Sequence, residues 1–241
     1  MKSKVFAILI FLSFLSCKKD DIHFLPKSIE NAQELVRQLK FDRNFINKLN
    51  ELYDQSRNNN YETGYILTTT KNNRNGNRFN YRFIKGSELT SAIVLDLNSP
   101  IDGLMHCHYK NLYPLFSCSD IKAVYDIYTN GFMGNYKRFI SLVVSSEGPA
   151  YILSINSIDS FRIFSDNYLA SIVSFRKLEN DYANTQQKYN ASYDKITSFE
   201  LSFFEVIASR SSLSVFKSLP PYEVWNKIEI STTDNKLSTP L

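Results

Sequence analysis

Apolar residues recur at helical spacing near the start of the chain and alternate with polar residues further along it. Over residues 29–53 they follow one another at intervals of three and four, which predicts one or two amphipathic helices. Residues 61–70 and 78–84 are rich in β-branched and aromatic side chains and flank Asn75-Gly76. This pattern predicts a β-hairpin, because Asn-Gly favours the tight turns that join antiparallel strands.

The remainder of the chain continues this mixture of elements. The expected elements are strands at 91–97 and 101–109, a helix at 120–128, strands at 139–145 and 150–155, helical segments at 168–188 and 198–209, and a strand at 224–230. Strands in the middle of the chain with helices at both ends predict an α/β (α+β) fold, in which a mixed β-sheet is flanked by helices.

The N-terminus, MKSKVFAILIFLSFLSC, places two lysines before an apolar run that ends at Cys17. This pattern is typical of an export signal, and the run is shorter than the roughly 20 apolar residues that span a membrane. Small residues before Cys17 resemble the lipobox of bacterial lipoproteins, which implies that Cys17 carries lipid; the alternative is an ordinary signal peptide. We expect a signal peptide at 1–16, a lipidated tether at 17–28 and a single domain at 29–232.

Charge and cysteine content narrow the class of protein. Removing the two lysines of the signal from the 28 basic residues leaves 26, against 24 acidic residues. The net charge of the mature chain is therefore about +2, which is too small to suggest binding to nucleic acid. Residues 18–21, Lys-Lys-Asp-Asp, resemble tags that direct lipoproteins to the cell surface, or form a solvated tether. We therefore expect an outer-membrane lipoprotein of the cell envelope. Cys107 and Cys118 could pair there or stay free.

The candidate chemistry lies in HCHYKNLYPLFSCSD, residues 106–120. In a strand, His106 and His108 share one face, as metal ligands must, although paired histidines are more often satisfied polar residues. Ser117 and Asp120 fit a helix-capping box on their own. Together, the two histidines and Asp120 offer two nitrogens, one carboxylate oxygen and an open fourth position, which is the ligand count of a catalytic zinc site.

This arrangement resembles the JAMM (JAB/MPN+) zinc metalloproteases, whose His-x-His-Pro and Ser-x-x-Asp motifs follow an upstream glutamate. YETGYIL, residues 61–67, is similar to the glutamate-containing segment. The resemblance covers about 61–155 and implies a JAB/MPN-like (cytidine-deaminase-like) core, with zinc held by His106, His108 and Asp120. It also implies that Glu62 is the general base and that Ser117 stabilises the tetrahedral intermediate. Two features depart from the family pattern: Tyr109 replaces proline, and the spacer to Ser117 is one residue longer.

The expected activity is zinc-dependent hydrolysis of peptide or isopeptide amide bonds, with one zinc ion per chain. Zinc lowers the pKa of a bound water to about 7, and a nearby carboxylate can take its proton. Glu88 is a rival for that base. The expected partners are a peptide or protein substrate and, through lipid on Cys17, the membrane; nucleic acid is not expected. The alternative is a catalytically silent JAMM-like binding module.

Overall fold

The computed structural model describes residues 31–69, 79–87, 91–230 and 237–238. Its strands form one mixed sheet in the order β2-β1-β3-β4-β5-β6-β7-β8. The strands are β1 (Thr63–Thr69), β2 (Phe79–Lys85), β3 (Gly103–His108), β4 (Ile140–Ser145), β5 (Ala150–Ile155), β6 (Leu213–Ser218), β7 (Asn226–Ile230) and β8 (Leu237–Ser238). β3 and β4 run parallel, and the other neighbouring pairs are antiparallel. The expected α/β fold with a mixed sheet is confirmed.

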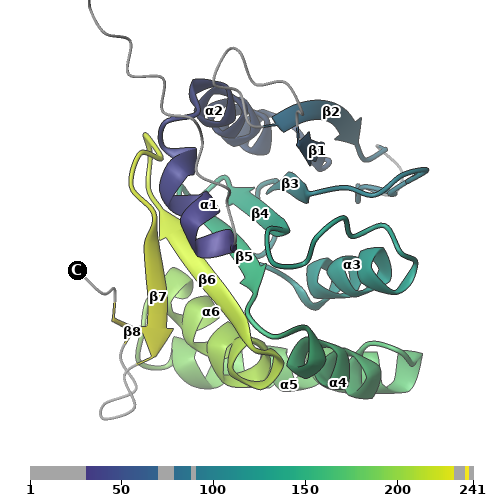
Figure 1. The fold of residues 1–241 in the computed structure, drawn as a ribbon. Coiled ribbons are helices and arrows are strands. Elements are labelled where there is room, and N and C mark those ends of the chain that lie inside the picture. The colour runs from purple at the N-terminus through teal and green to yellow at the C-terminus, as the bar shows by residue number, and fades with distance from the viewer. Residues whose placement is uncertain (1–30, 70–78, 88–90, 231–236, 239–241) are drawn as a thin grey trace, which may run out of the picture.

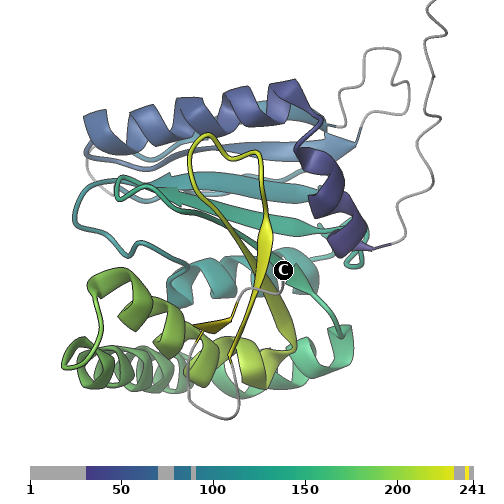
Figure 2. The ribbon, with the colours of Figure 1, turned by 90° about the vertical axis from the view of Figure 1, so that its left-hand side faces the viewer.

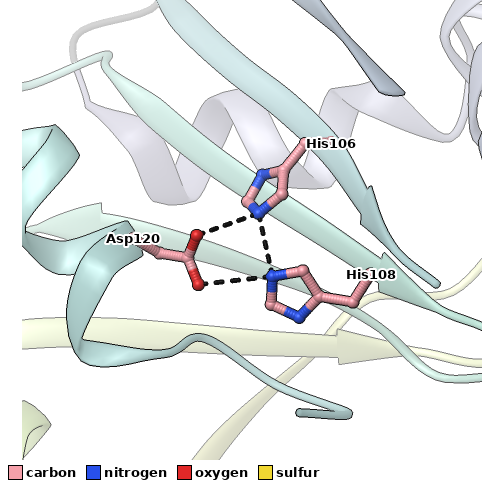
Figure 3. Close-up of side chains that lie close together, drawn as sticks. All are labelled: His106, His108 and Asp120. Atoms are coloured by element: carbon pink, nitrogen blue, oxygen red, sulfur yellow. Dashed lines mark hydrogen bonds and ion pairs between the residues drawn. The ribbon is translucent and has the colours of Figure 1, made fainter. Parts of the chain in front are cut away.

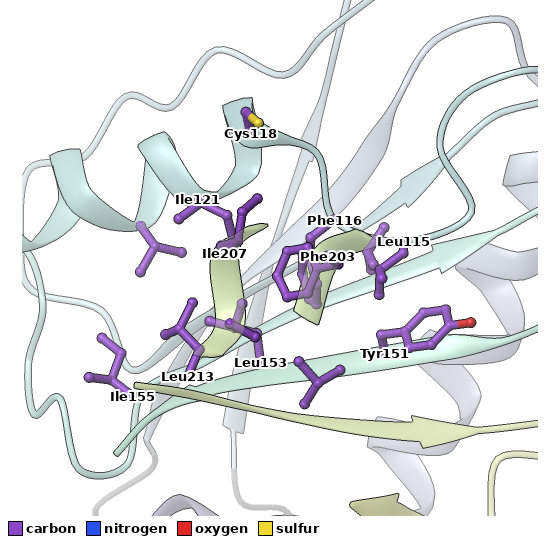
Figure 4. Close-up of a cluster of buried hydrophobic side chains, with 14 of the residues drawn as sticks. Leu115, Phe116, Cys118, Ile121, Tyr151, Leu153, Ile155, Phe203, Ile207 and Leu213 are labelled. Atoms are coloured by element: carbon purple, nitrogen blue, oxygen red, sulfur yellow. The ribbon is translucent and has the colours of Figure 1, made fainter. Parts of the chain in front are cut away.

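Helices cover both faces of this sheet (Figures 1 and 2). They are α1 (Ala32–Leu39), α2 (Arg43–Asn58), α3 (Cys118–Thr129), α4 (Ile158–Tyr168), α5 (Ile172–Asn190), α6 (Lys195–Phe203), the π-helical turn η1 (Phe204–Ala208) and α7 (Ser209–Ser211). α1 and α2 pack on one face with a first apolar cluster, and α3 to α7 pack on the other face with a second. Part of the second cluster is shown in Figure 4.

Strand β3 lies between β1 and β4, and all six of its residues are buried. Met105 and Cys107 belong to the apolar cluster under α1 and α2, whereas Leu104 belongs to the cluster under α3 to α7. His106 and His108 share the face of Leu104, because side chains alternate along a strand. The prediction that the two histidines lie on one face and Cys107 on the other is therefore confirmed.

The strand expected at 91–97 is wrong, since this segment pairs with no neighbouring strand. Its apolar residues do alternate, and Leu95 and Leu97 pack against the cluster under α3 to α7. The segment is held instead by single contacts, among them a hydrogen bond from the backbone N–H of Glu62 to the carbonyl of Ser91 (2.8 Å). Apolar and polar residues alternate here because one side of an extended segment packs on the apolar cluster. Such packing does not require hydrogen bonds to a neighbouring strand.

Other predictions need correction, and some concern residues outside the described ranges. Strand β6 was not predicted, and no separate bounds were predicted for α4. The helix expected at 168–188 begins only at Ile172, where Ser171 caps it by accepting from the N–H of Ser174 (3.1 Å). Cys17, the turn at 71–77 and Glu88 lie outside the described residues. Cys107 and Cys118 are both buried free thiols. Within the described ranges, no helix is long and apolar enough to cross a membrane.

Candidate metal centre

The side chains of His106, His108 and Asp120 converge between β3 and the start of α3 (Figure 3). The Nε2 atoms of the two histidines are 3.1 Å apart. Asp120 Oδ1 lies 3.0 Å from His106 Nε2, and Oδ2 lies 3.4 Å from His108 Nε2. The two histidines are buried and Asp120 is nearly so. These three residues form a group that could hold a metal ion.

The imidazole of His108 has a defined orientation. Its Nδ1 lies 2.8 Å from the carbonyl oxygen of Tyr113, which can only accept a hydrogen bond. The proton of a neutral His108 is therefore on Nδ1, and the lone pair on Nε2 faces Asp120. This is the usual arrangement of a metal-binding histidine, whose second nitrogen donates to an outer partner. Among the described residues, Nδ1 of His106 is buried without a hydrogen-bond partner.

Asp120 is positioned by the first turn of α3. Ser117 is the N-cap: its hydroxyl accepts from the N–H of Asp120 (3.3 Å), and its own N–H donates to Asp120 Oδ2 (2.6 Å). The hydroxyl of Ser117 also lies 2.8 Å from Oδ2. This is a complete capping box. The capping role of Ser117 and Asp120 is thus confirmed, and the same geometry turns Asp120 toward the histidines.

The charges in this cluster favour an ionised carboxylate. Burial acts to raise the pKa of Asp120, but the charges of His106 and His108 and their hydrogen bonds outweigh it and hold the pKa well below its usual range. For His108, burial acts to lower the pKa, whereas Asp120 and Glu62 raise it, and the net shift is upward. Asp120 is therefore ionised, which is the form of a carboxylate that can coordinate a cation.

Glu62 lies beside the three-residue group, immediately before β1. Its Oε1 is 3.8 Å from Nε2 of His108, and its Oε2 accepts from the backbone N–H of Ile93 at 3.3 Å. The backbone carbonyl of Glu62 accepts from the N–H of Gly86 at 2.7 Å, so both the main chain and the carboxylate are fixed. The structure therefore places all five residues that the sequence singled out next to one another.

No family model, curated protein or solved structure matches the chain.

A cleft of about 490 Å³ opens beside the cluster. Its polar end contains Glu62, His106, Ser117 and Asp120. Its walls are the 92–97 segment on one side and α3 on the other, and they include the apolar residues Ile93, Leu95, Leu97, Leu104, Ile127 and Phe132. The alternating apolar residues of 92–97 were the signal in the sequence for this wall of the cleft. The same alternation is also typical of a β-strand, so the sequence could not distinguish the two.

The segment between His108 and Ser117 forms a loop before α3. Asn111 there adopts a left-handed conformation with φ of 74°. Asparagine is one of the few residues other than glycine that adopt this conformation readily. A turn follows Tyr109 and is closed by a hydrogen bond of 3.2 Å from the N–H of Leu112 to the carbonyl of Tyr109. Tyr109 and Asn111 thus lie in one short turn, which precedes Ser117 and Asp120.

Proposed function

We propose that the protein is a zinc-dependent hydrolase of peptide or isopeptide amide bonds with a JAB/MPN-like core. The observation that carries this proposal is the convergence of His106 Nε2, His108 Nε2 and the Asp120 carboxylate at 3.0 to 3.4 Å from one another, with a cleft beside them. Three protein ligands and an accessible fourth position are typical of catalytic zinc sites, whereas structural sites use four protein ligands.

The donor set fits zinc in both distance and chemistry. Ligands about 2.1 Å from a tetrahedral zinc ion lie about 3.4 Å from each other, close to the three separations in this cluster. Imidazole nitrogen suits zinc, and a carboxylate completes a neutral or weakly positive site. No other set of three histidine, cysteine or acidic residues within the described part of the chain has this geometry.

The neighbouring residues of the chain supply acid–base chemistry. Bound zinc acts as a Lewis acid and lowers the pKa of a coordinated water to about 7. Glu62, 3.8 Å from His108, would accept a proton from the attacking water and donate it to the leaving amine. The hydroxyl of Ser117 would donate to the oxyanion that forms as the carbonyl is attacked. For that step it must turn away from Asp120, because a hydroxyl has only one proton to donate.

The cleft and the N-terminus together favour an extended peptide in the cell envelope as substrate. An open cleft with apolar walls can bury aliphatic side chains next to the scissile bond. An exported chain with lipid on Cys17 would meet peptides, surface proteins and peptidoglycan cross-links. We therefore propose that the enzyme is an outer-membrane lipoprotein that cleaves an amide bond in one of these classes.

The test is zinc stoichiometry by elemental analysis of the purified protein. We expect one zinc per chain in the wild type and none in Asp120→Ala or His106→Ala. Asp126→Ala is the matched control, since Asp126 lies on α3 and lines the same cleft but pairs with Lys122 (2.7 Å). A wild type without zinc would contradict the proposal and favour the alternative, a JAMM-like module that only binds its partner.

A further inference from the structure

The loop at 109–117 connects the two halves of the metal centre. It begins directly after His108 and ends at Ser117, the N-cap of α3. The carbonyl of Tyr113 within it accepts from His108, and Ser117 donates to Asp120. The loop has no regular secondary structure of its own. Its conformation, and with it the orientation of His108 and Asp120, must therefore be set by what it packs against.

What it packs against is the pair of helices α5 and α6. The ring of Tyr113 stacks on that of Tyr182 in α5, with centroids 5.8 Å apart and planes 14° from parallel. Phe199 of α6 meets Tyr113 edge-on at 5.0 Å. At the other end of the loop, Phe116 packs on Phe203 of α6 at 6.0 Å (Figure 4). These helices follow residue 155 and so lie outside the segment that resembles the metalloproteases.

Tyr182 contacts the loop at both functional points. Its ring lies against Tyr113, whose carbonyl holds His108, and its hydroxyl donates to the carbonyl of Phe116 at 3.3 Å, one residue before Ser117. Tyr182 is buried, and Phe199 and Phe203 pack around its ring, so its position is fixed. A rigid outer residue of this kind orients ligands without touching the metal.

We infer that Tyr182 is a positioning residue for the metal centre, holding the 109–117 loop so that His108 and Asp120 face one another. The expected effect on zinc affinity rests on the proposed metal centre, whereas the positioning of His108 itself requires neither bound zinc nor the proposed hydrolysis. It assigns a role to the C-terminal helices, which the sequence left unexplained: they support the ligand loop from behind. Loss of the Tyr182 ring should therefore loosen the site even though no ligand is altered.

The experiment compares Tyr182→Phe and Tyr182→Leu with Tyr189→Phe. Tyr189 lies on the same helix and donates a hydrogen bond of the same kind, to Glu205 at 2.6 Å, but touches neither the loop nor a ligand. We expect zinc affinity, measured by competition with a chromophoric chelator, to weaken by about threefold in Tyr182→Phe and about tenfold in Tyr182→Leu, the lower end of the range for outer residues. The visible absorption spectrum of the cobalt-substituted protein should also shift, less in Tyr182→Phe than in Tyr182→Leu. Tyr189→Phe should match the wild type in both.

A second readout needs no metal. In metal-free wild type at alkaline pH, the nitrogen NMR shifts of neutral His108 should show the proton on Nδ1, as the Tyr113 contact requires. In Tyr182→Leu the two tautomers should mix, because the carbonyl of Tyr113 is no longer held in place. Wild-type affinity, spectrum and tautomer in Tyr182→Leu would overturn the inference. A wild type without zinc would overturn the proposed function, and the tautomer would still decide this one.

Discussion

Gly64 faces His106 across the β1–β3 ladder, and its lack of a side chain lets the two strands approach. A methyl group at position 64 would collide with the carbonyl oxygen of Met105 and lie 3.1 Å from Cβ of His106. The backbone of β3 and the side chain of His106 leave such a methyl group no room. This close contact explains why a glycine stands two residues after Glu62, at the point where β1 passes the candidate metal centre.

Gly64→Ala should therefore disturb stability and metal binding together. Forcing a methyl group into a packed strand pair costs about 1 to 3 kcal/mol, and here the displaced strand carries His106. We expect a lower urea midpoint and weaker zinc affinity. Gly131→Ala is the control: a methyl there meets nothing within 4 Å, but φ is +75°, so only backbone strain is added. It should lower stability and leave zinc affinity unchanged; equal loss of affinity in both variants would contradict the prediction.

The metal-free protein should be most stable at intermediate pH. The raised pKa of His108 contributes stability below its unfolded value, and this contribution is lost as pH rises through the folded value. The lowered pKa of Asp120 contributes stability above its unfolded value, and this contribution is lost as pH falls. Urea unfolding of chelator-treated protein at a series of pH values measures how the free energy of unfolding falls at low and at high pH. Asp120→Asn should weaken both pH dependences. An unchanged pH dependence would show that His108 and Asp120 do not interact.

Glu62→Gln should separate binding from catalysis. The amide keeps the shape of the side chain and can still accept from the N–H of Ile93, but it cannot take a proton from water. We expect full zinc occupancy and a loss of peptidase activity of about 10²-fold or more, typical for removal of a general base. Asp96→Asn, at another carboxylate that lines the cleft, should keep its activity. Loss of zinc in Glu62→Gln would instead identify Glu62 as a ligand.

The two roles of Ser117 can be resolved by comparing glycine with alanine. Alanine is a poor N-cap, costing about 1 kcal/mol, whereas glycine costs only a few tenths. Both remove the hydroxyl that would donate to the oxyanion. Ser117→Gly and Ser117→Ala should therefore differ in thermal stability but lose about the same activity, roughly 10²-fold or more. Full activity in Ser117→Gly would confine Ser117 to its capping role.

Much of the fold follows from local patterns in the sequence, but not all of it. Ala150–Ile155 is a strand with the boundaries expected, because a short apolar run ends there at polar residues. The 92–97 segment has an equally clear alternation and forms no strand, because partner strands are set by the whole sheet. The strand β6 (Leu213–Ser218) was not predicted, since the predicted elements passed from the helix at 198–209 to the strand at 224–230.

The candidate site was likewise predicted only in part from the sequence. His106, His108 and Asp120 lie within one short segment, so their spacing was enough to predict that they meet. Glu62 required the family resemblance, since a lone glutamate before a strand has no distinctive spacing. Tyr182 could not have been found from the sequence, because its hydrogen bond to Phe116 joins residues 66 positions apart. Only the packed structure brings that helix under the loop.

The stacking of Tyr113 on Tyr182 has a consequence for the order of events as the chain is made. His106, His108 and Asp120 all leave the ribosome before Tyr182 does. A nascent chain that ends before α5 carries the three proposed metal ligands but lacks the helices against which the 109–117 loop packs. Capture of the ion is therefore expected to be a late event of maturation, after the last helices have docked, so unfinished chains should not trap metal.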